Sequence, residues 1–152
     1  MFKIALFCGG PSLERGISLN SARSVLDHLA RPGLEIQPIY INQQKKAYAI
    51  STAQLYSNTP SDFDFKLAQT AVALSEKGLV AKLKKVDLVF PAIHGEYGDD
   101  GELQAFLEEH NIPFVGSMSK ACEQMFHKIK AAQKLAENGF FTYPAAILRP
   151  QN

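Results

Sequence analysis

Short apolar runs alternate along this chain with stretches whose apolar residues have helical spacing. This pattern predicts strands alternating with helices. Four short apolar runs predict buried strands, at residues 3–8, 36–41, 87–91 and 112–115. Apolar residues at helical spacing follow the first, third and fourth of these runs. This alternation predicts a three-layer α/β fold with a mostly parallel sheet, its strands ordered second, first, third, fourth.

The first strand ends at Gly9 and Gly10, before a polar loop that carries Glu14 and Arg15. Ser18 is a residue type that caps helices, so we expect a helix from Ser18 to about residue 29. The glycine pair lacks the third glycine of a dinucleotide-binding loop. Free backbone N–H groups in the loop and the following helix N-terminus favour an anion there.

The third strand leads into a loop of glycines, acidic residues and His94, over residues 87–101. A helix follows at once, with Leu103 and Leu107 on one face. Open α/β sheets hold their binding sites beyond the carboxyl ends of strands, so this loop is a candidate site. The acids also fit a structural role, because Asp99 and Glu102 have the spacing of a capping box. The residues alone leave both interpretations open.

The middle of the chain predicts smaller elements. Residues 47–51 fit an antiparallel strand, and alternating positions at 70–75 and 78–83 predict a hairpin insertion. Toward the end, one long helix is expected over residues 120–138, with Gly139 after it as a C-terminal cap. Its expected inner face holds Cys122, Met125, Phe126, Ile129, Ala132 and Ala136.

Composition is that of one soluble globular domain: 152 residues, 46% hydrophobic and 20% charged. The net charge of +1 argues against nucleic-acid binding. No apolar run reaches membrane-spanning length and no signal peptide is visible, so we expect a cytoplasmic protein without a membrane partner. Cys8 and Cys122 are expected as buried free thiols. The four histidines and two cysteines show no metal-ligand spacing, so no metal site is predicted.

Three stretches together resemble the amino-terminal, pre-ATP-grasp domain of D-alanine–D-alanine ligases. They are GGPSLERGISLNSA (residues 9–22), FPAIHGEYGDDGELQAFLE (90–108) and IPFVGSMSKACEQMFHK (112–128). The resemblance implies a Rossmann-like domain over residues 1–141, with residues 142–152 beginning a linker to an ATP-grasp domain that this chain lacks. The whole enzyme would join two D-alanines for peptidoglycan, the bacterial cell wall that sets cell shape. It would use ATP and Mg²⁺ to make an acyl phosphate, and it would be a homodimer.

The resemblance also implies roles for individual residues. Glu14 falls on the glutamate that holds the ammonium of the first D-alanine, which suits a carboxylate. His94 falls on a histidine that donates to that substrate's carboxyl group and acyl phosphate. Lys128 falls on a lysine that reaches the ATP phosphates. The residues expected to shape the substrate loop are Gly9, Gly10, Ser12 and Gly95.

This chain departs from the family pattern at three places. Gly16 stands where a second acid is usual, Asp99 where a glutamate is usual, and Phe126-His127 where Met-Asp precedes the lysine. The last change lies directly before Lys128, and the amino acid that the enzyme would prefer stays open. The alternative is a freestanding flavodoxin-like module for binding or dimerisation, without catalysis. In either case we expect the chain alone to be inactive and to hold no cofactor.

Overall fold

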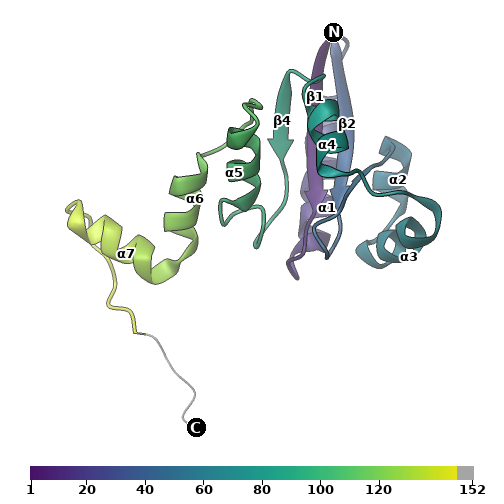
Figure 1. Ribbon diagram of the computed structural model, residues 1–152. Coiled ribbons are helices and arrows are strands. Elements are labelled where there is room, and N and C mark those ends of the chain that lie inside the picture. The colour runs from purple at the N-terminus through teal and green to yellow at the C-terminus, as the bar shows by residue number, and fades with distance from the viewer. Residues whose placement is uncertain (147–152) are drawn as a thin grey trace.

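A four-stranded sheet in the order β3-β2-β1-β4 forms the centre of the fold (Figure 1). The computed structural model describes residues 1–146. Strands β1 (Phe2–Gly9), β2 (Leu34–Ile41) and β4 (Leu88–Pro91) run parallel, whereas β3 (Ala47–Ala49) pairs antiparallel with β2. The predicted mostly parallel sheet is therefore confirmed.

The segment after Ile112 lies beside β4, as the predicted strand order requires. The Val89 N–H donates to the Pro113 carbonyl oxygen at 2.8 Å, and the Val115 N–H donates to the Val89 carbonyl oxygen at 3.0 Å. Only one parallel bridge forms, between Val89 and Phe114. Proline has no N–H to donate, so Pro113 limits the ladder to this bridge rather than a full strand.

Helices cover both faces of the sheet, which confirms the predicted three layers. One face is covered by α1 (Arg15–Leu29), α2 (Thr52–Ser57) and α3 (Pro60–Thr70), and the other by α4 (Glu76–Leu83) and α5 (Glu102–Glu109). Alternate residues of β1 face the two layers: Leu6 and Cys8 pack with α1, and Ala5 and Phe7 pack with α4 and α5. Among residues 1–146, no helix is both long and apolar enough to cross a bilayer.

The predicted hairpin insertion is wrong, because residues 76–83 form helix α4. The Ser75 hydroxyl caps this helix by accepting a hydrogen bond from the Gly78 N–H at 3.1 Å. Leu79 and Leu83, which alternation had suggested for a strand, are four apart and are buried together against the sheet. Of the first hairpin arm, only Leu74 pairs, through a single antiparallel bridge to Ala47.

The expected long helix is instead two helices, α6 (Ser119–Phe126) and α7 (Lys128–Glu137). His127 has extended backbone angles, φ −82° and ψ 100°, and separates them. The two helices lead away from the sheet (Figure 1), and neither has a fully buried residue. The predicted buried inner face is thus wrong here, since Met125 and Phe126 are exposed. Gly139, at φ +82°, ends α7 as predicted.

The two cysteines differ in their surroundings. Both are free thiols, and Cys8 is fully buried as predicted. Burial raises the pKa of the Cys8 thiol to about 12. Cys122 is only half-buried, so the prediction of burial is wrong for this residue. It lies on α6, a helix without buried residues.

Candidate functional site

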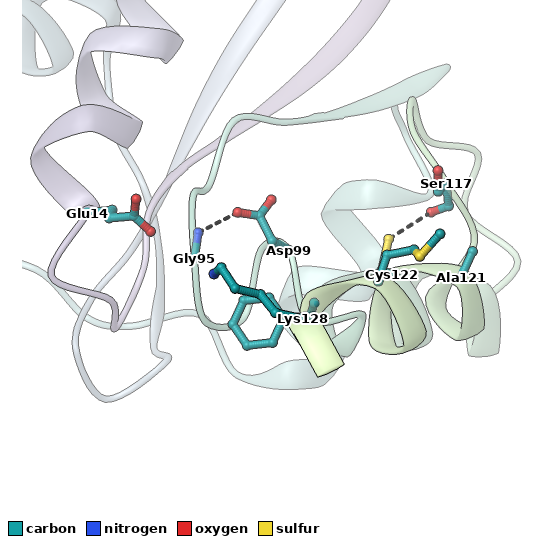
Figure 2. Close-up of a pocket in the computed structure, with 9 residues that line it drawn as sticks. Glu14, Gly95, Asp99, Ser117, Ala121, Cys122 and Lys128 are labelled. Atoms are coloured by element: carbon teal, nitrogen blue, oxygen red, sulfur yellow. Dashed lines mark hydrogen bonds between the residues drawn. The ribbon is translucent and has the colours of Figure 1, made fainter. Parts of the chain in front are cut away.

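Two loops meet at the carboxyl edge of the sheet, one after β1 and one after β4. These strands are parallel neighbours, so the loops that follow them emerge side by side. Figure 2 shows the Glu14 side chain directed toward the loop segment that carries Gly95. The Ser12 hydroxyl also lies there, and it accepts a hydrogen bond from the Glu14 N–H at 3.0 Å. The fold thus brings residues about eighty positions apart into one site.

Gly95 is the residue that permits this close approach. A Cβ atom at this position would lie 2.6 Å from Glu14 Oε2 and would overlap the Ser12 hydroxyl. The Gly95 backbone also has φ +74°, which glycine adopts without steric cost. Any larger residue would therefore displace the side chains of Ser12 and Glu14.

The Ser18 side chain links the end of β1 to the residue that follows β4. It is fully buried, accepts a hydrogen bond from the Gly9 N–H at 2.8 Å and donates to the Ala92 carbonyl oxygen at 2.7 Å. The predicted N-cap role of Ser18 is therefore wrong. Helix α1 begins earlier, at Arg15, and Glu14 precedes it without a side-chain cap.

The backbone N–H groups of the β1 loop are largely engaged within the protein. Gly9 donates to Ser18, Gly10 donates to the Ile41 carbonyl oxygen at 2.8 Å, and Glu14 donates to Ser12. The expectation of an anion held by free N–H groups of this loop is not supported at these positions. Gly9, Gly10 and Ser12 contribute by fixing the loop's shape.

His94 points its ring toward helix α1. Its Nε2 atom lies 2.7 Å from the hydroxyl oxygen of Ser21, so the two side chains share a hydrogen bond. The backbone of the next residue, Gly95, faces Glu14. His94 and Glu14 therefore belong to one local structure, although their side chains have different partners.

The acidic residues of the β4 loop stabilise it internally. Asp99 Oδ2 accepts a hydrogen bond from the Gly95 N–H at 2.6 Å, drawn as a dashed line in Figure 2. Asp100 accepts from the N–H groups of Tyr97, at 2.9 Å, and Glu102, at 3.0 Å. The predicted capping box of Asp99 and Glu102 is wrong, because left-handed Gly101 is the N-cap.

Helix α6 forms the opposite side of the site. Its first residue, Ser119, donates from both its N–H, at 2.7 Å, and its hydroxyl, at 2.6 Å, to the Glu108 carboxylate of α5. These bonds lower the pKa of Glu108. Gly101 lies directly under Ser119, where a Cβ atom would overlap the Ser119 carbonyl oxygen. Helix α6 is thereby fixed against the end of the β4 loop.

Between the loops and α6 lies a cavity of about 690 Å³. It is lined by Glu14, Gly95, Asp99, Ser117, Ala121, Cys122, Met125, Phe126 and Lys128. Two carboxylates and one ammonium group thus share the cavity with an apolar wall from α6 (Figure 2). Burial first, and then the nearby carboxylates of Asp99, Glu108 and Asp100, raise the pKa of the Cys122 thiol. A zwitterionic ligand with a small apolar side chain matches these surroundings.

Comparison with known proteins identifies the family. A family model described as D-ala D-ala ligase N-terminus matches residues 3–117, which is most of the chain. The chain belongs to this family. The match includes Glu14, His94 and Gly95 but ends before Lys128. The expected domain boundary at residue 141 stays a prediction, and residues 147–152 of the expected linker lie outside the described residues.

Individual relatives are ligases by name. A D-alanine–D-alanine ligase of Chlorobaculum tepidum is 38% identical over 125 residues, which cover 74% of this chain and 34% of the relative. The ligase structure from Coxiella burnetii has a TM-score of 0.77 and 28% identity, covering 91% of this chain and 42% of that one. The VanG D-Ala:D-Ser ligase from Enterococcus faecalis has a TM-score of 0.71 and 28% identity, with the same coverage of 91% and 42%. The chain therefore spans less than half the length of these relatives.

The structure brings some of the predicted site residues of this ligase domain together. Glu14, Gly95 and Lys128 line the cavity, and Ser12 touches Gly95 beside it. Sequence reasoning gave no binding role to Asp99, and it assigned the α6 residues Cys122, Met125 and Phe126 to a buried core. Their spacing was the available signal, because these three apolar residues share one face of a helix. Lys128, at the start of the next helix, lines the same cavity.

The cavity offers few charged groups to a cofactor. Lys128 would meet a phosphate group, but it is the one lysine or arginine among the residues that line the cavity. Within residues 1–146, no three His, Cys, Asp or Glu side chains are grouped so that they could hold a metal ion. The residues described here fit one contact to a nucleotide and do not fit a Mg²⁺ site.

Proposed function

We propose that this chain is the substrate-binding domain of an ATP-dependent ligase that joins two D-alanines. The proposal is supported by family membership and by the cavity. Charged side chains of Glu14, Asp99 and Lys128 line this cavity together with an apolar wall from α6. A ligase of this kind would supply peptidoglycan synthesis and would work in the cytoplasm. The relatives' names favour this function over a freestanding binding or dimerisation module. A homodimer stays a prediction.

The observation that carries the proposal is the position of the Glu14 carboxylate, which lies next to the Gly95 backbone. A substrate ammonium taken from water into the cavity needs a charged acceptor, and the Glu14 carboxylate lies at the cavity wall. Asp99 faces the same cavity, but one of its oxygens already accepts from Gly95. Glu14 therefore has the more available carboxylate for the first D-alanine.

The carboxylate of the substrate is negatively charged, so it requires hydrogen-bond donors. In the proposed reaction the substrate carboxylate becomes an acyl phosphate, so negative charge persists at that end. A histidine N–H that reaches this end of the substrate would stabilise such charge. His94 does not itself line the cavity, but it directly precedes Gly95, which does. We assign this role to His94, and we assign Lys128 to a phosphate of the nucleotide. Mg²⁺ would be held by residues outside this chain and would bridge the phosphates there.

The test is the affinity for D-alanine of the Glu14→Gln variant, made in the protein as its gene encodes it. Loss of a charge-assisted hydrogen bond predicts roughly tenfold to a hundredfold weaker apparent binding of the first D-alanine. Glu96→Gln is the matched control, because Glu96 is an exposed acid of the β4 loop that does not line the cavity. Equal affinity in wild type and Glu14→Gln would remove Glu14 from the site. A protein that forms tight dimers but binds no D-alanine would favour the dimerisation module.

A further inference from the structure

Two serines of α1, one turn apart, hold the segment that follows β4. Ser18 donates to the Ala92 carbonyl oxygen at 2.7 Å, and Ser21 contacts His94 Nε2 at 2.7 Å. Residues three apart on a helix lie on the same face, so both hydroxyls reach the same segment. Ser18 is buried and fixes the backbone, whereas Ser21 meets the imidazole that the segment carries. Helix α1 therefore orients both the chain and the imidazole.

The bond to Ser21 engages one of the two ring nitrogens of His94. Nε2 is committed to α1, and within residues 1–146 the Nδ1 atom of His94 has no hydrogen-bond partner in the protein. A neutral imidazole carries one N–H and one bare nitrogen, and the partner of one nitrogen selects the state of the other. A bare Nδ1 would repel a substrate carboxylate, whereas Nδ1–H would donate to it. A serine hydroxyl can serve as the donor to Nε2, which then needs no proton.

We propose that Ser21 is a positioning residue that donates its hydroxyl proton to His94 Nε2 and holds the imidazole as the Nδ1–H tautomer. The Nδ1–H group then donates to the negatively charged oxygens of the substrate. This assignment rests on the proposed function for the identity of the ligand. The tautomer can be measured in the free protein, whether or not that protein binds D-alanine, because the Ser21–His94 contact is present without a ligand.

The tautomer can be read directly by long-range ¹H–¹⁵N correlation on ¹⁵N-labelled protein, in conditions where imidazole is neutral. His94→Gln identifies the His94 signals among the four histidines. We expect a protonated Nδ1 and an unprotonated Nε2 in wild type. Ser21→Ala is expected to give a mixture of tautomers, and Ser21→Thr to retain the wild-type state. A wild-type His94 protonated at Nε2, alone or at both nitrogens, would overturn the inference.

Binding supplies the second measurement, in the protein as its gene encodes it. Ser21→Ala should weaken D-alanine binding about fivefold, the effect of one neutral hydrogen bond, and Ser21→Thr should restore it. Ser24→Ala is the matched control, since Ser24 is exposed one turn further along α1. Unchanged affinity in Ser21→Ala would overturn the positioning role. If wild type bound no D-alanine, the proposed function would fail, while the tautomer measurement would still decide whether Ser21 controls His94.

Discussion

Arg15 and Asp64 form an ion pair, with Arg15 Nη1 2.5 Å from Asp64 Oδ2, that ties the start of α1 to α3. The two side chains are 17% and 32% exposed, so the pair is partly removed from water. Arg15 directly follows Glu14 in the chain. Helix α3, which contributes nothing to the cavity lining, thus fixes the backbone that carries the proposed ammonium-binding carboxylate.

Asp64→Asn should destabilise the protein by about 1–2 kcal/mol, between the values of exposed and buried ion pairs. It should also weaken D-alanine binding, because the start of α1 becomes less fixed. Urea denaturation and binding measurements check the two effects. Glu137→Gln is the control, since its pair with Lys134 is fully at the surface and should contribute little. Equal unfolding midpoints for wild type and Asp64→Asn would contradict the predicted contribution.

Gly95→Ala should impair both stability and D-alanine binding. The left-handed backbone alone predicts a loss of about 1–2 kcal/mol for any residue with a Cβ atom. The new Cβ would also displace Ser12 and Glu14. Gly33→Ala separates these effects, because Gly33 has φ +90° but a Cβ atom there would meet no other atom within 4 Å. Equal unfolding free energies and unaltered D-alanine affinity in the two variants would show that the close approach at Gly95 is unimportant.

Attachment of α6 should depend on pH through Glu108. Hydrogen bonds from Ser119 lower the folded-state pKa of Glu108 below its value in the unfolded chain. The resulting stabilisation is present above the unfolded-state pKa, about 4.3 for glutamate, and is lost as pH falls through the folded-state pKa. The urea midpoint of Glu108→Gln should therefore lie below that of wild type at pH 7 and approach it in acid. Glu109→Gln, an exposed neighbour, should show no such trend. A difference that stays constant with pH would rule out this role for Glu108.

Residues 1–152 alone should bind Mg-ATP with millimolar or weaker affinity and should not release phosphate in the presence of D-alanine. Lys128 is exposed, and one exposed ion pair contributes about 0–1 kcal/mol. Phosphoryl transfer needs metal-bridged phosphates and several cationic contacts. Calorimetry with Mg-ATP and a phosphate-release assay test this, with Lys128→Met as the comparison. Micromolar binding, or turnover, would show that this chain contains a complete nucleotide site.

The sequence determined the layers, the strand order and the sheet edge at which the candidate site lies. Apolar runs such as residues 3–8 are nearly continuous, as in strands buried on both faces, and Leu103 and Leu107 lie one helical turn apart. Parallel neighbours then bring the loops of Glu14 and His94 to one sheet edge, which is a consequence of topology rather than of side-chain detail. The sequence determined the secondary structure of short segments less well. Residues 78–83 fit both periods, and burial of Leu79 and Leu83 against the sheet decided for a helix.

Only the tertiary structure decided how polar side chains are used. Ser18 has the residue type of a helix cap, but its hydroxyl bridges Gly9 and Ala92, which lie at the ends of different strands. Asp99 has the spacing of a capping box, but its carboxylate binds the Gly95 N–H. A polar side chain bonds whichever partner lies within about 3 Å, and such partners are set by long-range packing. Apolar burial depends on pattern, which a sequence displays, whereas hydrogen-bond partners depend on positions that only the folded chain defines.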